Sequence, residues 1–249
     1  METQTNPPSI FSKSHHYVQI SGILLFFALE LVLFVRIFSA PSDGAAWATL
    51  GLGLALGYVS GDFASGFVHW LFDRYGTVDT PVVGQPFIKP FRIHHVDQKD
   101  ITLHGFVDTN GNNCLATNPF LIALMFFPTP SGAGLNLLFQ AFFAALCVGV
   151  FATNQFHKWS HEDNPSPVVR WLQDHHLILG RAHHAIHHAP PYDKYYCIMA
   201  GWLNLPLAKL HFWENLEALI FKLTGVQAGV EDAAMVEAAR QAHAQPGNV

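Results

Sequence analysis

Hydrophobic side chains gather in four long stretches that are separated by polar or turn-forming segments. They cover residues 18–38, 45–72, 115–127 and 135–156. A helix that crosses a bilayer needs about 20 mostly apolar residues, so the pattern predicts about four transmembrane helices, of which the third is short. The second stretch begins with alternating Leu and small residues, which let helices pack closely. The expected fold class is an all-α integral membrane protein with a helical cap outside the bilayer.

Composition agrees with this expectation. Charged residues make up 12% of the 249-residue chain, against roughly 25% in a typical soluble protein. The net charge of −5 is modest, which gives no reason to expect a nucleic-acid partner. The three cysteines are too few and too scattered for a disulfide framework.

Basic residues predict the orientation. All 13 Lys and Arg residues except Arg36 lie in the N-terminal tail, between residues 74 and 99, or after residue 156. The short connections 39–44 and 128–134 contain none. The positive-inside rule therefore puts both termini and the long middle segment in the cytosol, with Arg36 snorkelling outward. The short, polar N-terminal tail without a signal peptide favours a bacterial inner membrane, with the endoplasmic reticulum as the alternative.

The segment 183–188 carries four histidines in six residues. On a helix, His184, His187 and His188 would share one face, and His183 would pair with His187. So many imidazoles in a core would leave ring nitrogens unpaired. Imidazole is a neutral nitrogen ligand for iron, zinc or copper, so the segment predicts a polyhistidine metal site.

Further histidines lie at the same predicted side of the membrane. His157 and His161 are one helical turn apart, and His69 ends the second stretch. His94 and His95 point about 100° apart on a helix, so they serve either two metals or one metal and its surroundings. One catalytic zinc needs three protein ligands and a haem at most two, so this many imidazoles favour a pair of ions.

Other polar residues are expected near such a site. Asp62 and Asp73 share one helix face with His69, where a carboxylate could accept a hydrogen bond from a ligating imidazole. Asn154 could hold a metal-bound water, with helix packing as an equal alternative. His104 and His176 are weaker candidate ligands. His15, His16 and His243 lie in the tails and are expected to be bystanders, and His211 is expected at the membrane interface. His175 is either a ligand or, with His176, part of a solvated loop pair.

Two segments remain open. The polar run 109–113 predicts a turn that either lines a substrate entrance or is simply a turn. The stretch 207–223 alternates apolar and charged residues, which suits an amphipathic helix on the membrane surface or one packed against the cap.

Neutral nitrogen ligands at a membrane surface suggest oxygen activation directed at a lipid chain. Iron is favoured by this reaction logic, since the ligand type alone would also allow zinc. The chain has no nucleotide or flavin motif, so the electrons must come from a separate carrier.

Several motifs resemble those of the Kua, or plasmanylethanolamine desaturase, family. They are residues 61–70 (GDFASGFVHW), 90–95 (PFRIHH), 109–114 (TNGNNC), 153–161 (TNQFHKWSH), 181–188 (RAHHAIHH) and 196–204 (YCIMAGWLN). The resemblance spans about residues 50–225. It implies an O₂-dependent membrane desaturase that converts the 1-O-alkyl ether of an ethanolamine phospholipid into the vinyl ether of a plasmalogen. It also implies two iron ions and an electron donor such as cytochrome b5 or a ferredoxin-like carrier.

On this resemblance, residues 1–17 form an N-terminal tail, residues 18–225 a membrane lipid desaturase domain and residues 226–249 a C-terminal tail. The implied metal ligands are His69, His94, His95, His104, His157, His161, His176, His183, His184, His187 and His188. Position 175 departs from the family pattern, because an aromatic residue is expected there.

Two alternatives stay open. A desaturase or hydroxylase of the same diiron class could act on an acyl chain instead, as related plant proteins do on phosphatidylglycerol. A membrane haem or metal carrier without catalytic activity is the third interpretation.

Overall fold

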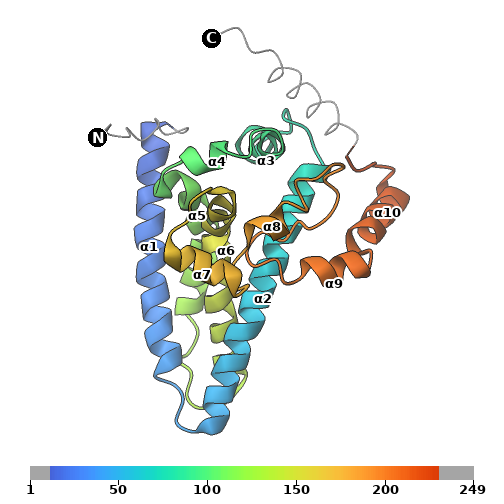
Figure 1. Ribbon diagram of the computed structural model, residues 1–249. Coiled ribbons are helices and arrows are strands. Elements are labelled where there is room, and N and C mark those ends of the chain that lie inside the picture. The colour runs from blue at the N-terminus through green and yellow to red at the C-terminus, as the bar shows by residue number, and fades with distance from the viewer. Residues whose placement is uncertain (1–11, 230–249) are drawn as a thin grey trace. The chain divides into compact units, whose positions relative to one another are not determined.

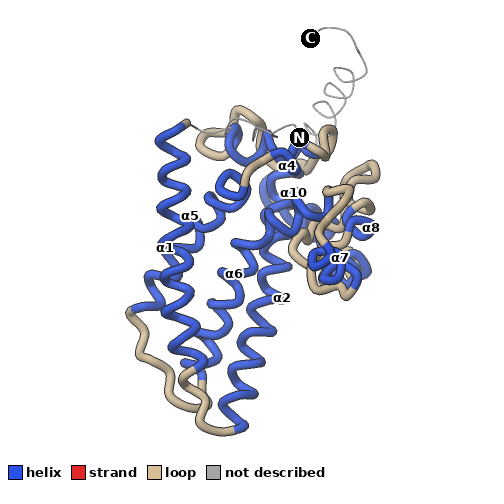
Figure 2. The backbone as a smooth tube through the Cα atoms, turned by 60° about the vertical axis from the view of Figure 1, so that its left-hand side comes forward, coloured by secondary structure: helices blue, strands red, loops and turns tan. Residues whose placement is uncertain are grey.

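The computed structural model describes residues 12–229, which form helices and loops without a strand (Figure 2). The elements in chain order are α1 (Lys13–Phe38), α2 (Gly44–Arg74), the π-helix η1 (Gly84–Ile88), α3 (Lys89–His94), α4 (Asp100–Leu103), α5 (Phe106–Met125), α6 (Leu135–His161), α7 (Pro167–Asp174), α8 (Arg181–His184), α9 (Asn204–Lys209) and α10 (Phe212–Thr224). The predicted all-α fold is confirmed over these residues. The tail beyond residue 229, with His243, lies outside them.

This part of the chain divides into two compact units. The first contains residues 12–64 and 103–159, and the second contains residues 65–102 and 160–229. The division falls within α2 and α6, so each of these helices belongs to both units.

In the first unit, α1, α5 and the first parts of α2 and α6 run side by side (Figure 1). Their shared core is apolar and includes Phe26, Leu33, Ile37, Leu121 and Leu137, each 1% exposed or less. Burial of side chains of this size typically stabilises a fold by about 1.5–3 kcal/mol each in water.

The turns of the first unit are tied together by hydrogen bonds. The Gly132 N–H donates to the Ala40 carbonyl at 3.1 Å, which joins the α5–α6 connection to the α1–α2 connection. Arg36 donates to the carbonyls of Leu124 and Phe127 at the end of α5. Its guanidinium therefore adds hydrogen bonds to carbonyls at the C-terminal end of α5, whereas the sequence suggested only that Arg36 snorkels outward.

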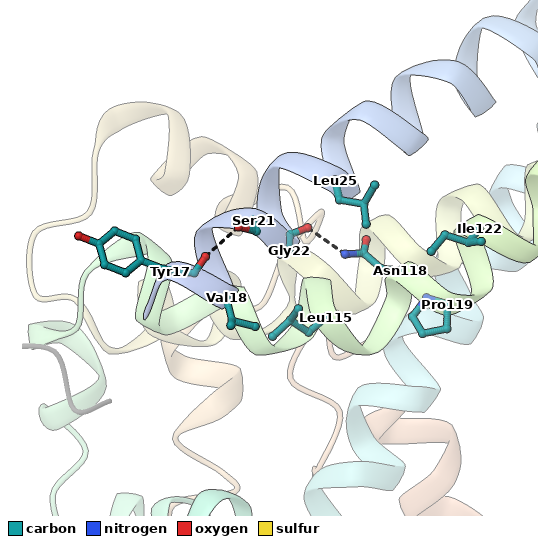
Figure 3. A pocket seen from close by; sticks show the side chains of 9 residues that line it. All are labelled: Tyr17, Val18, Ser21, Gly22, Leu25, Leu115, Asn118, Pro119 and Ile122. Carbon is teal, nitrogen blue, oxygen red and sulfur yellow. Dashed lines mark hydrogen bonds between the residues drawn. The ribbon is translucent and has the colours of Figure 1, made fainter. Parts of the chain in front are cut away.

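A shallow apolar groove lies between α1 and α5 (Figure 3). Gly22 makes the close approach possible, because a Cβ there would lie 2.6 Å from Leu115 Cδ2. The Asn118 side-chain amide donates to the Gly22 carbonyl at 2.9 Å. Pro119 follows within α5 and has no N–H to give to the preceding turn. Asn118 thus ties the two helices at the point where the α5 ladder is interrupted.

The polar run 109–113 is not a turn. It forms the first part of α5, because its side chains find partners that a helix permits. The Asn110 amide donates to Gln155 Oε1 at 3.1 Å and the Asn113 amide to the Val150 carbonyl at 2.8 Å. The expectation of a turn at these residues is therefore wrong.

Two of the described helices, α1 and α6, are long and apolar enough to cross a membrane. About four spans were expected from the sequence, and among the described helices these two are candidate spans. Helices corresponding to the other two stretches are present as α2 and α5, but both carry polar residues. Only 33% of the apolar window of α1 and 39% of that of α6 is buried, so most of this surface faces outward.

The second unit has short helices and long loops around an aromatic core. Trp70, Tyr196 and Trp213 are each 3% exposed or less, and the Trp70 and Trp213 rings stack with centroids 5.2 Å apart. Ser65 on α2 accepts a hydrogen bond from the Ile198 N–H at 3.0 Å. This contact fixes the loop before α9 against α2.

We predict that Gly57→Ala on α2 lowers the free energy of unfolding by about 1–3 kcal/mol. A Cβ at Gly57 would lie 2.2 Å from the Phe142 carbonyl oxygen and 2.8 Å from Ala145 Cβ on α6. Backbone cannot move aside as a flexible side chain does. The measurement is the thermal unfolding midpoint of the purified protein in detergent.

Gly51→Ala on the same helix is the matched control, because a Cβ at Gly51 meets nothing within 4 Å. It should leave stability unchanged or raise it by about 0.5–1 kcal/mol through helix propensity. Equal effects of the two substitutions would contradict close packing at Gly57.

Candidate metal centre

Three imidazoles and a carboxylate converge in the second unit. They are His69 and Asp73 on α2, His95 directly after α3 and His187 after α8, and all four are buried. One ligand atom from each lies within 4.8 Å of the other three. We call these residues the first group.

Asp73 lies at the centre of the first group. Its Oδ2 is 3.2 Å from His69 Nε2, 3.4 Å from His95 Nε2 and 3.5 Å from His187 Nε2. Its side chain is inaccessible to solvent, and neither carboxylate oxygen accepts a hydrogen bond. A buried carboxylate that accepts no hydrogen bond is costly, and a bound cation would compensate for it.

The protons of two of these rings are assigned by their outer hydrogen bonds. His69 Nδ1 lies 3.1 Å from the Tyr196 carbonyl oxygen, and His187 Nδ1 lies 2.9 Å from the Lys194 carbonyl oxygen. A carbonyl oxygen only accepts, so Nδ1 donates in both cases and Nε2 keeps its lone pair. The lone pairs therefore point into the first group, as in metal sites whose ligands are oriented by carbonyls.

The second group contains four histidines of the same unit, whose ligand atoms also lie within 4.8 Å of one another. They are His94, His161, His184 and His188, all buried. His94 Nε2 lies 2.9 Å from His161 Nε2, and His184 Nε2 lies 2.9 Å from His188 Nε2. Ring nitrogens aimed at one point suit a metal ion better than a hydrophobic core.

His157 precedes His161 by one turn on α6 and is 4% exposed. Since α6 is unbroken between them, the two rings share a helix face. The spacing seen in the sequence thus survives in the structure.

The two groups are neighbours. The rings of His187 and His188 have centroids 5.4 Å apart, and those of His95 and His188 are 5.6 Å apart. Two pairs of consecutive histidines, His94–His95 and His187–His188, each have one member in the first group and one in the second. This arrangement suits two ions side by side.

Arg92 links the end of α2 to α3 and so helps to position both groups. It is 2% exposed. Its guanidinium donates to the carbonyls of Phe72 and Tyr75 at 3.3 Å each and to that of Gly76 at 2.8 Å. A basic side chain at a helix C-terminus satisfies carbonyls that have no partner within the helix.

Burial keeps these imidazoles in the form that binds metal. It lowers the pKa of His187 to about 4, with repulsion from His95 adding to the effect. Burial also lowers the pKa of His94 and of His188, followed by repulsion from His161 and from His94 respectively. Neutral imidazole with a free lone pair is the ligand form, so no proton has to leave these rings before a metal binds near pH 7.

Comparison with known proteins agrees with the site. A family model described as a lipid desaturase domain matches residues 58–231. A plasmanylethanolamine desaturase of Myxococcus xanthus is 46% identical over 230 residues, which cover 92% of this chain and 80% of that relative. Plasmanylethanolamine desaturase 1 of Mus musculus is 47% identical over 185 residues, which cover 73% of this chain and 68% of that relative. This chain belongs to the plasmanylethanolamine desaturase family.

The resemblance drawn from the sequence motifs and the prediction of an oxidoreductase are therefore confirmed. The chloroplastic fatty acid desaturase 4 of Arabidopsis thaliana is 34% identical over 174 residues, which cover 69% of this chain and 51% of that relative. No solved structure matches the chain.

Three predicted ligands of this desaturase, His104, His176 and His183, belong to neither group of the described residues. His176 is exposed, has a left-handed backbone with φ of 54°, and its carbonyl accepts from Trp202 Nε1. His183 Nε2 accepts a hydrogen bond from the Asn204 side-chain amide at 3.0 Å, which occupies its lone pair. His104 is half-buried before α5, and its carbonyl accepts from Lys158.

The carboxylates and the asparagine expected to support the ligands have different places. Asp73 lies among the ligand atoms themselves, although the sequence suggested only a hydrogen-bonding role. Asp62 is fully buried on α2, two turns before His69. The Asn154 amide donates to the Thr109 carbonyl at 3.1 Å, so it joins α6 to α5, which is the helix-packing alternative.

Sequence reasoning missed the backbone carbonyls of Lys194 and Tyr196 as orienting groups. Every residue has a backbone carbonyl, so the residue types in a sequence do not show which carbonyl will accept a hydrogen bond from a ligand. It also missed Tyr192, whose ring stacks on His95 with centroids 4.8 Å apart and planes 6° apart.

We predict that Asp73→Asn weakens metal binding in the first group by about 10-fold or more. The substitution keeps the shape but removes the charge at the centre of the group. Metal per chain, measured by plasma mass spectrometry after dialysis against a graded chelator series, tests this. Asp79→Asn, at an exposed position a few residues on, is the control and should retain wild-type metal. Equal metal retention in the two variants would remove Asp73 from the site.

We also predict that His183→Ala and His184→Ala behave differently. His184→Ala should release metal from the second group. His183→Ala should keep both metals and lose about 1–3 kcal/mol of stability, because one buried hydrogen bond from the Asn204 amide is lost. Metal analysis and thermal unfolding on the same preparations separate the two effects. Loss of metal in His183→Ala with an unchanged unfolding midpoint would make His183 a ligand.

Proposed function

We propose that this desaturase converts the 1-O-alkyl chain of a plasmanylethanolamine into the vinyl ether of a plasmalogen, in an O₂-dependent reaction. The two groups of the metal centre are proposed to hold two iron ions. His157 is proposed as a further ligand of the second group, because it shares a helix face with His161.

The observation that carries this proposal is the pair of adjacent, buried ligand groups in a chain that is 46% identical to a plasmanylethanolamine desaturase over most of its length. The fit to metal rests on the donors themselves. Ring nitrogens of buried imidazoles converge on a buried carboxylate in one group and on one another in the other.

The reaction removes one hydrogen from each of the first two carbons of the alkyl chain. Oxygen leaves as two waters after accepting those two hydrogens together with two electrons and two protons from outside the substrate. When bound, two iron ions supply the one-electron chemistry that reduces O₂ and removes hydrogen from an unactivated CH₂ group. The described residues contain no flavin or nucleotide motif, so we propose a cytochrome b5 or a ferredoxin-like carrier as the electron donor.

The chain's own residues orient the ligands. The carbonyls of Tyr196 and Lys194 hold the protons of His69 and His187 on the outer nitrogen, so that the inner nitrogen faces the metal. Arg92 holds α3 against the end of α2, which aligns His94 and His95 with His69 and Asp73. Rigid support of this kind reduces the reorganisation needed during the reaction.

We further propose that the first unit is embedded in a membrane with both termini on the cytosolic side. The connections 39–43 and 126–134 carry no Lys or Arg. They also meet through the Gly132–Ala40 hydrogen bond, as expected if both lie on the outer side. A bacterial inner membrane remains our preferred location, with the endoplasmic reticulum as the alternative.

An acyl-chain substrate is the second candidate, and one specific observation favours it. The fatty acid desaturase 4 of Arabidopsis thaliana matches 69% of the chain. Neither ligand group distinguishes an ether from an ester, so the lipid product must decide.

We predict that a host containing alkyl-ether ethanolamine lipids but no plasmalogens will make plasmalogens when it expresses this chain. Lipid mass spectrometry should detect an acid-labile vinyl ether that has lost two hydrogens. His187→Ala should reduce the product by about 100-fold or more, because it removes a ligand from the first group. His175→Ala is the matched histidine control at an exposed position and should retain activity.

Unchanged ether lipids in membranes with metal-loaded protein and an active electron donor would contradict the ether substrate. New double bonds in acyl chains would then favour the second candidate, and gain of one oxygen would indicate a hydroxylase.

A further inference from the structure

Helix α10 has two faces with different surroundings. One face packs against the end of α2 within the second unit, and the other leaves large apolar side chains exposed. The sequence left open whether the stretch 207–223 lies on a membrane or packs against the cap. The structure shows that its inner face is packed, which leaves the outer face to be explained.

The inner face is held by specific contacts. Trp213 is 3% exposed and stacks on Trp70. The Glu217 carboxylate accepts hydrogen bonds from Trp70 Nε1 at 3.0 Å and from Arg74 Nε and Nη2 at 2.8 and 3.1 Å. Trp70 and Arg74 each follow directly a member of the first ligand group, His69 and Asp73. The orientation of α10 about its own axis is therefore fixed.

The outer face carries an apolar stripe. Phe212, Leu216, Leu219 and Leu223 follow one another at spacings of four, three and four residues, so they line one side of the helix. Leu219 is 51% and Leu223 is 74% exposed. Phe212 and Leu216 are half-buried, because they border the packed face. An exposed stripe of this kind is unusual on a surface that meets only water.

The same feature continues before α10. Leu205 on α9 is 49% exposed and Leu210, between the helices, is 68% exposed. Lys209 and Lys222 are exposed at the ends of α9 and α10. Glu214, 58% exposed, lies on the opposite side of α10 from the stripe, as the 100° turn per residue requires, and Phe221, 54% exposed, is the one large apolar side chain beside it. Apolar side chains with lysines beside them and a carboxylate turned away match the chemistry of an anionic membrane surface.

We propose that α10 lies in the plane of the membrane interface. Its stripe reaches the boundary between headgroups and acyl chains, and Lys209 and Lys222 contact lipid phosphates. The occupant of the stripe is phospholipid. Because α10 is bonded through Glu217 and Trp213 to residues that adjoin His69 and Asp73, this contact holds the metal centre at the lipid surface. The proposal requires a membrane but not an ether-lipid substrate.

Fluorescence quenching tests the depth of α10 directly. Leu223→Cys and, on the opposite side, Glu214→Cys are each labelled with a nitrobenzoxadiazole maleimide in the full-length protein. The native cysteines Cys114, Cys147 and Cys197 are buried, and the unsubstituted protein gives the background labelling. The labelled proteins are reconstituted in vesicles of phosphatidylcholine with one third phosphatidylglycerol. Lipids with a doxyl spin label near the headgroup then act as the quencher.

We expect quenching at Leu223→Cys to exceed that at Glu214→Cys by about threefold or more, with a blue-shifted emission at Leu223→Cys only. Leu219→Cys, on the same stripe, should repeat the result and guards against a local defect at Leu223. Metal content equal to wild type identifies the variants that are folded. Lys209→Gln with Lys222→Gln should lessen the quenching in these anionic vesicles but not in pure phosphatidylcholine.

Equal, weak quenching at both positions would overturn the proposal and leave the stripe in water. A blue shift at Leu223→Cys without lipid quenching would also overturn it, and would indicate a protein partner. If that shift disappeared in nanodiscs holding one protein each, the partner would be a second copy of the chain. None of these readouts needs turnover, so the proposal and the enzymatic activity can fail independently.

Discussion

The metal centre depends on one constraint, which is that buried imidazole nitrogens and a buried carboxylate have to be held close together in the interior. The outer hydrogen bonds of His69 and His187 hold their protons on the far side of each ring, and burial keeps His94, His187 and His188 neutral. In a low-dielectric interior this is unfavourable until a cation binds. The surrounding helices therefore have to hold in place an arrangement that the ligands alone would not keep.

Several devices provide that support. Arg92 bonds three carbonyls at the end of α2, and the Arg74–Glu217 pair fixes α10 beside the same turn. The loop before α9 supplies the carbonyls of Lys194 and Tyr196 and is itself held by Ser65. Residues far apart in the sequence thus cooperate to present His69 and Asp73, and three of them, Arg74, Lys194 and Glu217, lie outside the sequence motifs.

The helical class, two of the four expected membrane spans as candidates, and the histidines of the two ligand groups could be predicted from the sequence, because hydrophobic period and i, i+4 spacing are local properties. The shared face of His157 and His161 depends only on an unbroken helix, and α6 is unbroken between them. His183 could not be separated from His184 in advance, since what distinguishes them is the amide of Asn204, 21 residues away. Asp73 was expected beside the ligands, but its central position depends on how α3 and the segment after α8 approach α2. A turn was wrongly predicted at residues 109–113, because asparagine generally favours turns. Here the asparagine side chains find hydrogen-bond partners on a neighbouring helix, which permits the helical conformation.

The division of His94–His95 and of His187–His188 between the two groups has a consequence for the geometry of the pair. Two consecutive Cα atoms are about 3.8 Å apart across a trans peptide, whatever the packing around them. In each pair, a single rigid peptide unit therefore fixes the distance between one Cα that serves the first group and one that serves the second. The two ligand groups are thus linked covalently at two places, independently of the side-chain packing around them. An insertion of one residue within either pair would disturb both groups at once.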